Sequence, residues 1–480
     1  MKIGIGWARK GGWAWVVFFA MAAGVQGGTG ESFPIAGQSG PEGGGVCPAF
    51  DGTNVLVGIE SGETNKLHFQ FVDPDEGPVG NRIDLGIYGN TPQIGYGAGT
   101  YLLTWSGYVG TGWQLFGQRL GTDGIAIGSP FQISASPGNA YPSDIARIPF
   151  GNNWFLQVWQ DYRRGENPDL YGRFVKSDGT LGTAEISIAV DTPNEDDGNY
   201  SMAYGDGKFL VVFSAERRSG MYDGEDVYGQ LVALGVGRVG SNFVIDQNDL
   251  PSSNPTAVCW DGEKFTVLFH DALPVGEGEE QWDLSARFVS SAGVVATNRI
   301  AIADSPMESE MFPTLSFDGQ RYLVSLTSFV SPSNGVSKAR FYDKQLNPLT
   351  PWFLLAPTAD EAAFSSTIPA GEGRFFAGTS YMVWVPSDDG DGDDAVIVRT
   401  DGRKVTPDAP RCVGGGIVGS DYTLLYSDLF LGTSNHLERI DSLTSTNGWI
   451  EETSFYCTTS STNLTGAAPW PQQFIRLRVE

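Results

Sequence analysis

The sequence predicts an all-β fold, and three features of its composition carry that prediction. Its 480 residues include 64 Gly and 27 Pro, the residue types that mark tight turns. The 13 Trp, 17 Tyr and 28 Phe are scattered among the glycines, which is typical of short strands joined by turns. Only 18% of the residues are charged and 41% are hydrophobic, so the chain is too apolar for disorder and too poor in charge for a helical bundle or coiled coil.

The first 27 residues have the pattern of a secretory signal peptide. They open with three basic residues, Lys2, Arg9 and Lys10. The apolar run 13–20 follows, and small residues then lead to an expected cleavage site near Ala22 or Gly27. A single membrane anchor is the alternative, but the apolar run is shorter than the roughly 20 residues that a span requires. No second long apolar run follows, so we expect the mature chain to be secreted, periplasmic or at the cell surface, without a membrane span.

The balance of charge excludes several classes of partner and cofactor. Against 30 Lys and Arg stand 56 Asp and Glu, and the formal net charge is -26. A surface with this excess of acidic residues repels phosphate backbones and anionic lipid headgroups. We therefore expect no nucleic-acid partner. The three histidines are far apart in the sequence and no CxxC pair occurs, so we expect no zinc or other transition-metal cofactor.

A unit of roughly 45 to 58 residues recurs along the chain. Each copy has an Asp-Gly or Gly-Asp turn, an apolar strand of the type Phe-Leu-Val-Val-Phe, a polar loop, and a strand of the type Asp-Val-Tyr-Gly-Gln. No unit shows a sustained helical period. The clearest copies cover residues 101–133, 154–188, 204–245 and 260–288, and weaker copies lie at 49–52, 317–324 and 381–402.

About four short strands in each unit predict a β-propeller over residues 33–405. One four-stranded blade cannot bury both of its faces, and closing the blades into a ring covers them. Ser32–Ala36 is similar to the fourth-strand pattern of Phe131–Ala135, so we expect an N-terminal strand to complete the last blade. An open array of sandwich domains would need units of about 100 residues. Seven blades are expected, with starts near Pro48, Pro92, Pro142, Ser201, Pro255, Pro313 and Thr367.

The repeat resembles repeats of secreted bacterial propeller-like proteins, most of them of unassigned function. The similarity lies in the Tyr-Leu-Val-Val-Trp-like second strand, the loop that begins with Asp or Glu and then Arg, and the Asp-Ile-Tyr-Gly-Arg-like third strand. It covers about residues 40–405 and is strongest over 91–290. The resemblance implies a structural repeat and carries no site residues across.

Residues 411–480 follow a different pattern. Leu437–Ile440, Trp449 and Phe474–Arg478 resemble a small C-terminal β-module found in secreted proteins of planctomycete and verrucomicrobial type. The sequence departs from that family at Ile440-Asp441, where Ala-Ser is usual, and at Ile475, where Tyr is usual. The alternative is an eighth blade over 411–457, because residues 421–426 also match a second strand.

The four cysteines are compatible with an oxidising compartment. Cys412 and Cys457 flank most of the last segment and would close a loop of about 45 residues as a disulfide, which we expect to stabilise by a few kcal/mol. Cys259 lies between Val258 and Trp260 in a strand pattern. It is therefore expected to be a small buried residue and not a nucleophile.

The most acidic segment, 388–394, is a candidate calcium loop. Its carboxylates at alternate positions, Asp389, Asp391 and Asp393, are spaced so that a loop can bring them to one hard cation. The EF-hand rule fails, because Asp394 stands where Gly is required and Thr400 where a bidentate Glu is required. A solvated turn is the preferred interpretation, and we expect no other cofactor.

Acidic and basic residues recur in the blade loops in a way that favours structure over catalysis. Asp161, Arg163 and Asp169 in one copy match Glu216, Arg217 and Asp226 in the next. A catalytic acid and base need different environments, whereas equivalent positions give similar ones. Neither a sialidase-type box nor a Gly-x-Ser-x-Gly motif occurs.

Two classes of function remain. The first is a non-catalytic, monomeric, secreted propeller that binds an extracellular glycan or protein through its loops. The alternative is a polysaccharide-processing glycoside hydrolase or lyase, with two carboxylates facing each other at the central funnel. We expect the first, because the loops carry aromatic residues that can stack on sugar rings, namely Tyr108, Trp113, Tyr162, Tyr222 and Trp282.

Overall fold

The structure is a computed structural model of the chain. It describes residues 32–35 and 42–479, apart from the gaps 62–65, 75, 111, 136–138, 143–146, 166–167, 190–196, 216–225, 248–252, 277–278, 306–307, 332–333, 356–361, 372–373, 387–392, 406–410, 419–420, 428–433, 441–449, 457–460 and 468–473. In segments such as 381–386, 393–402 and the strands beyond 410, only the backbone is described. Every regular element in the described residues is a β-strand, and no helix there is long and apolar enough to cross a membrane.

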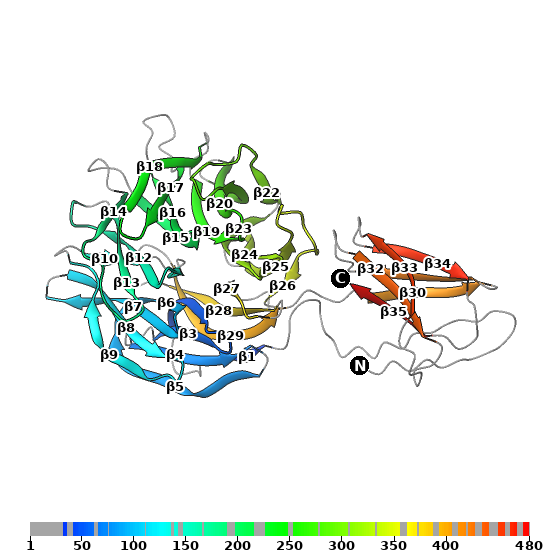
Figure 1. Cartoon of the computed structure of the whole chain (residues 1–480), viewed down its shortest axis with the longest axis horizontal. Coiled ribbons are helices and arrows are strands. Elements are labelled where there is room, and N and C mark those ends of the chain that lie inside the picture. Colours follow the sequence, from blue (N-terminus) through cyan, green and yellow to red (C-terminus); the bar gives the residue numbers. More distant parts are fainter. Residues whose placement is uncertain are drawn as a thin grey trace. The chain divides into compact units, whose positions relative to one another are not determined.

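Seven antiparallel blades form the ring shown in Figure 1, which confirms the predicted fold class. Blade one consists of β2 (Glu42–Phe50), β3 (Val55–Ser61), β4 (Lys66–Asp73) and β5 (Gly77–Tyr88). Blade two consists of β6 (Asn90–Gly97), β7 (Thr100–Val109), β8 (Gly112–Gly121) and β9 (Ala126–Gln132). In blade three, the short strands β10 (Ala140–Tyr141) and β11 (Phe150–Gly151) both pair with β12 (Trp154–Asp161), which is followed by β13 (Asp169–Lys176) and β14 (Ile186–Ala189).

The next three blades repeat the same order of strands from the ring axis outwards. Blade four consists of β15 (Asp197–Gly205), β16 (Lys208–Ala215), β17 (Asp226–Ala233) and β18 (Gly237–Asp246). Blade five consists of β19 (Ser253–Trp260), β20 (Phe265–Gly276), β21 (Glu279–Val289) and β22 (Ile300–Ala303). Blade six consists of β23 (Ser309–Phe317), β24 (Tyr322–Ser331), β25 (Asn334–Tyr342) and β26 (Phe353–Leu354).

The N-terminal strand completes the seventh blade, as the sequence predicted. This blade consists of β27 (Ala362–Pro369), β28 (Phe375–Pro386) and β29 (Asp393–Val405), and β1 (Phe33–Pro34) pairs with β29. Phe33 lies opposite Gly402, and the next residue, Ile35, is buried in a cluster with Val55, Val57 and Phe376. Two segments far apart in the sequence thereby close the ring.

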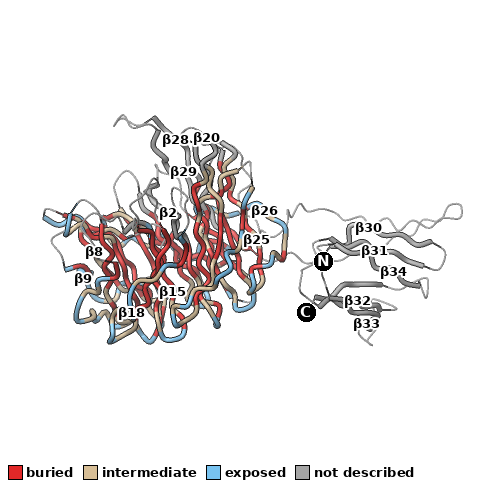
Figure 2. Tube along the Cα trace, turned by 90° about the horizontal axis from the view of Figure 1, so that it is seen from above, coloured by how far each residue is buried: buried red, intermediate tan, exposed pale blue. Residues whose placement is uncertain are grey.

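Apolar clusters lie between neighbouring blades. One joins Leu156 and Val158 of blade three to Val211 and Phe213 of blade four, and similar clusters lie between blades one and two, two and three, four and five, and seven and one. Figure 2 shows the same arrangement as a buried band through the middle of the ring strands. Each blade therefore buries both faces only because a neighbour covers them.

The Asp-Gly turns explain the sharp corner between the first and second strands. Gly52, Gly262 and Gly319 have φ angles of 100°, 94° and 100°, which an L side chain rarely adopts. The aspartate before each glycine accepts backbone hydrogen bonds two and three residues further on; Asp261 Oδ1, for example, accepts from the N–H of Glu263 and of Lys264 at 2.8 Å each.

The C-terminal segment is not an eighth blade. β30 (Arg411–Val418), β31 (Asp421–Ser427) and β34 (Ser461–Ala467) form one three-stranded sheet. β33 (Ile450–Tyr456), β32 (Ser434–Ile440) and β35 (Phe474–Val479) form another. Because β31 pairs with β34 and not with β32, these strands do not form the four-stranded meander expected of a blade.

Candidate functional site

The candidate site lies on one edge of blades two and three. In an antiparallel blade, the loop between the second and third strands lies at the same edge as the connector that enters from the preceding blade. This edge is called the loop face below. Three of the five aromatic residues predicted from the sequence, Tyr108, Trp113 and Tyr162, lie here, in or directly after β7, β8 and β12.

Four aromatic rings follow one another along the loop face. The ring centroids of Tyr108 and Trp113 are 5.5 Å apart, those of Trp113 and Tyr141 are 6.1 Å apart, and those of Tyr141 and Tyr162 are 5.9 Å apart. The side chain of Tyr108 is 62% exposed, whereas the other three are partly buried. These four residues are called the aromatic row. Edge-to-face and tilted contacts hold the rings against one another and leave apolar ring surface towards solvent.

The backbone fixes the row across the boundary between the two blades. Tyr108 and Trp113 are cross-strand partners in β7 and β8. The N–H of Trp113 donates to Asn139 Oδ1 at 2.9 Å, and the N–H of Tyr162 donates to the carbonyl oxygen of Asn139 at 3.0 Å. Asn139 thus ties the loop of blade two to the loop of blade three.

Tyr141 is the member of the row that the sequence analysis missed. It precedes Pro142, which that analysis used only to mark the start of a blade. Thr91 and Phe312 occupy the same position before Pro92 and Pro313, so the residue before this proline lies at the loop face in several blades. An aromatic residue directly before a blade-starting proline was therefore the available signal.

An ion-pair network supports blade three beneath the row. Arg163 Nε lies 2.8 Å from Asp161 Oδ1, and its NH2 lies 2.6 Å from Asp161 Oδ2. Its NH1 lies 2.7 Å from Glu185 Oε2, and Trp159 Nε1 donates to Asp161 Oδ2 at 2.9 Å. Burial disfavours the charged guanidinium, but the hydrogen bonds to Asp161 and Glu185 outweigh this and raise the pKa of Arg163.

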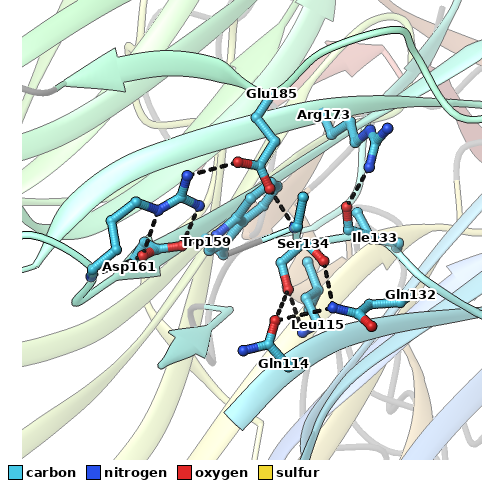
Figure 3. A network of polar contacts seen from close by, with 11 residues as sticks. Gln114, Leu115, Gln132, Ile133, Ser134, Trp159, Asp161, Arg173 and Glu185 are labelled. Atoms are coloured by element: carbon cyan, nitrogen blue, oxygen red, sulfur yellow. Dashed lines mark hydrogen bonds and ion pairs between the residues drawn. The ribbon is translucent and has the colours of Figure 1, made fainter. Parts of the chain in front are cut away.

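This network also ties blade three to blade two. Glu185 Oε1 accepts a hydrogen bond from the backbone N–H of Ala135 at 2.6 Å, and Arg173 NH1 donates to the carbonyl oxygen of Ile133 at 2.9 Å. Figure 3 shows both contacts beside the buried Asp161 and Trp159. The polar atoms of the network bind one another and the backbone. Contacts of this kind are expected if these acids tie neighbouring loops together.

The strand register refines the predicted match between blades three and four. Asp169 pairs with Asp161, and Asp226 pairs with Ala215. Asp169 and Asp226 are therefore equivalent, but the counterpart of Asp161 is Ala215, and Glu216 comes one residue later. Blade five supplies a third equivalent pair, in which Asp283 lies opposite Asp271.

Trp282 lies in blade five, apart from the row. Its ring meets His270 edge to face, with centroids 4.8 Å apart, and its backbone N–H donates to Ser309 Oγ at 3.3 Å. Burial lowers the pKa of His270 to about 4, so this imidazole is neutral at pH 7. Asp271, next in the chain, binds Arg299. These contacts fit the interpretation of His270 and Asp271 as residues at the entry of a loop.

Several predicted site residues lie outside the described residues. Tyr222 does, and so do Asp389 and Asp391, whereas only the backbone of Asp393 is described, at the start of β29. The calcium and disulfide hypotheses stay predictions, because the side chains of Cys412 and Cys457 are not described either. Within the described part of the chain, no three His, Cys, Asp or Glu side chains cluster closely enough to hold a metal ion.

Cys259 is only partly buried, whereas the sequence predicted a small buried residue, but its thiol is unreactive. It lies in β19, and burial raises its pKa to about 12, so the reactive thiolate is absent at neutral pH. Cys47 in β2 is similar, with a pKa raised to about 11 by burial.

Two carboxyl groups at the start of β23 were missed by the sequence analysis. Lys338 Nζ binds Glu308 Oε2 at 2.6 Å, Ser328 Oγ donates to the same oxygen, and both contacts lower the pKa of Glu308. Glu310 is 1% exposed, and burial raises its pKa to about 7. Ser328 lies opposite Glu310 in the strand register, so the two carboxyl groups share one neighbourhood.

Glu310 should make the stability of the protein depend on pH. A raised pKa means that the folded state binds the proton more tightly than the unfolded state, so the stability from this group is lost as the pH rises from about 4.5 to about 7. We expect E310Q to remove this loss and to gain up to about 3 kcal/mol over the wild type between pH 5 and pH 8. Urea denaturation at both pH values measures the difference.

Glu308 provides the matched control for that experiment. Its pKa is lowered, so its contribution is present above its ordinary pKa and is lost as the pH falls. We therefore expect E308Q to destabilise the protein at pH 8 and to matter less near pH 3. The raised pKa of Glu310 would be contradicted if the free energy of unfolding of the wild type did not change between pH 5 and pH 8 and the difference between E310Q and the wild type stayed constant.

Strand pairing defines the class of protein: this chain is a seven-bladed β-propeller. No family model matches the sequence, and no curated protein matches it. Many solved structures are similar in fold, and the three named below all have TM-scores below 0.5. A puromycin-hydrolyzing peptidase of Mycobacterium tuberculosis has a TM-score of 0.45 and 12% identity; the match covers 83% of this chain and 61% of the peptidase.

Two further similar structures are matched over nearly their whole length. A protein of unknown function from Dyadobacter fermentans has a TM-score of 0.44 and 10% identity over 79% of this chain and 98% of that one. A subtype N10 neuraminidase-like protein of A/little yellow-shouldered bat/Guatemala/060/2010 has a TM-score of 0.40 and 9% identity over 78% of this chain and 99% of that one.

Proposed function

We propose that this chain is a secreted propeller that binds an extracellular glycan through the aromatic row and does not cleave it. The observation that carries the proposal is the series of three contacts between four aromatic rings along one edge of blades two and three, ending in a tyrosine that is 62% exposed. Apolar ring faces bind the C–H face of a sugar, while hydroxyl and amide groups bind its hydroxyls. Secretion is part of the proposal and rests on the signal-peptide pattern of residues 1–27.

The groups around the row suit a neutral sugar. The exposed side chain of Asn139 offers an amide N–H beside Trp113, while its oxygen accepts from the backbone. Burial and the neighbouring Tyr162 raise the pKa of Tyr141, so its hydroxyl keeps its proton. The acids beneath the row, Asp161 and Glu185, are engaged by Arg163. A sugar hydroxyl would therefore meet neutral donors and acceptors.

Replacing Tyr108 tests the proposal. We expect Y108A to lower the affinity for the bound glycan about fivefold, because an exposed stacking contact contributes about 1 kcal/mol. The matched control is Y88A, since Tyr88 in β5 is also 62% exposed but makes no contact with the row. Binding is measured first on a glycan array and then by affinity electrophoresis in gels that contain the polysaccharide.

Two outcomes would overturn the proposal. Equal losses in Y108A and Y88A would show that the row is not the binding surface. A blank glycan array combined with capture of a protein partner that Y108A abolishes would assign the row to protein recognition instead.

A second candidate function, hydrolysis of a polysaccharide, is favoured by one observation. Glu308 and Glu310 have pKa values shifted in opposite directions, as a catalytic base and acid require. Both residues belong to blade six, however, and Glu308 is held by Lys338, whereas the hydrolase hypothesis requires carboxylates that face each other from different blades. Release of reducing ends from a polysaccharide, abolished in E310Q, would establish hydrolysis in place of binding.

A further inference from the structure

Arg147 reaches across the axis of the ring. It lies between β10 and β11, on the inner side of blade three. Its NH1 lies 3.4 Å from Ser316 Oγ in β23 of blade six, and its NH2 donates to the carbonyl oxygen of Thr367 in β27 of blade seven. Blade three borders neither of those blades, so the guanidinium stands on the axis, near the edge opposite the loop face where β23 and β27 end.

The described groups around this guanidinium are neutral. Besides Ser316 and Thr367, the residues that act on it are the thiols of Cys47 and Cys259, whose raised pKa values keep them protonated. Burial lowers the pKa of Arg147, and it is the one arginine of the described residues for which this holds. No acidic side chain of the described residues pairs with it, although acids outnumber bases in this chain by 56 to 30.

An unpaired buried cation is costly, and an anion offsets that cost. A guanidinium has five N–H donors, of which the two contacts above use two. Arg147 also keeps some solvent-accessible surface. The free donors form a planar fork, which matches the two oxygens of a carboxylate.

We propose that Arg147 is the anchor of an anion site on the ring axis, and that the anion is a carboxylate. Two sources share this chemistry: a small free carboxylate, and the acid group of a uronic acid sugar. The site is separate from the aromatic row, so it goes beyond the proposed glycan binding and does not depend on it.

Thermal unfolding of the mature protein tests the site. Acetate, galacturonate and neutral galactose are each titrated up to 10 mM at constant ionic strength and pH 7. We expect a saturable rise in Tm of about 2 °C or more with at least one of the two acids and none with galactose. Equal responses to both acids identify a free carboxylate as the ligand, and a stronger response to galacturonate identifies a sugar acid.

The variants R147M and R173M separate the anion site from a general effect of removing an arginine. Arg173 also donates to backbone carbonyl oxygens, of Gly182 and Ile133, but it lies on β13 away from the axis. We expect R147M to lose the saturable response and R173M to keep it. Y108A should keep it as well, whatever becomes of glycan binding.

Two results would overturn the proposal: a wild-type Tm that does not respond to either acid, or an undiminished response in R147M. If R147M does not fold, R147K replaces it. Lysine keeps the charge but lacks the planar fork, so we expect its half-saturating concentration to rise at least about tenfold. An unchanged half-saturating concentration in R147K would then exclude Arg147 as the anchor.

Discussion

Replacing Arg163 with methionine should lower the free energy of unfolding by about 3 to 5 kcal/mol. Arg163 is the partner of both Asp161 and Glu185, and the side chain of Asp161 is fully buried. R163M therefore leaves a buried carboxylate without its cation, which costs far more than an exposed ion pair contributes. Urea denaturation followed by tryptophan fluorescence measures the loss.

The neighbouring arginine is the control for that experiment. Arg164 pairs with Asp169 at 3.2 Å, and its side chain is 30% exposed. We expect R164M to cost less than R163M, because Arg163 binds both Asp161 and Glu185, at shorter distances of 2.6 and 2.7 Å. Similar losses in R163M and R164M would show that the buried network is not the element that stabilises this blade.

Removing the N-terminal strand should lower Tm by about 5 °C or more. A chain that starts after residue 36 lacks β1 and the buried side chain of Ile35, and blade seven loses its outer strand. Loss of one buried isoleucine alone costs about 2 to 5 kcal/mol, and each kcal/mol corresponds to about 1 to 2 °C in a chain of several hundred residues, because the entropy of unfolding grows with chain length. Differential scanning calorimetry of the truncated and full mature chains measures the shift.

Two point variants define the cause of that shift. I35A removes the buried contact and should account for a large part of it, whereas P34A changes an exposed residue and should shift Tm by less than about 2 °C. An unchanged Tm in the truncated chain would mean that the ring does not depend on β1 for its closure.

The architecture was predictable because its signals are local and repeated. Asp261-Gly262 shows one: the aspartate caps the turn and the glycine adopts a positive φ, both within four residues. An alternation of such turns with apolar strands gave the number of blades. The closing strand was predictable for the same reason, since Ser32–Ala36 has the pattern of a fourth strand.

The candidate site was predictable only in part. Three members of the aromatic row were predicted to lie in loops; Tyr162 does, but Tyr108 and Trp113 lie at the adjoining ends of β7 and β8, and Tyr141 at the start of an inner strand was not predicted. Trp282 was predicted in a loop as well, yet it lies in β21 and packs against His270 in blade five. Aromatic residues in loops can be listed from a sequence, whereas their order along one face depends on which blades are neighbours.

The sequence by itself determined the all-β class, the seven repeated blades and the N-terminal closing strand, because each follows from patterns within about 60 residues. The tertiary structure alone decided that Arg147 meets Thr367 across the ring, that Glu310 is buried beside Glu308 and Lys338, and that four rings form one row. The physical reason is that these properties depend on burial and on contacts between residues up to 220 positions apart, which no local period encodes.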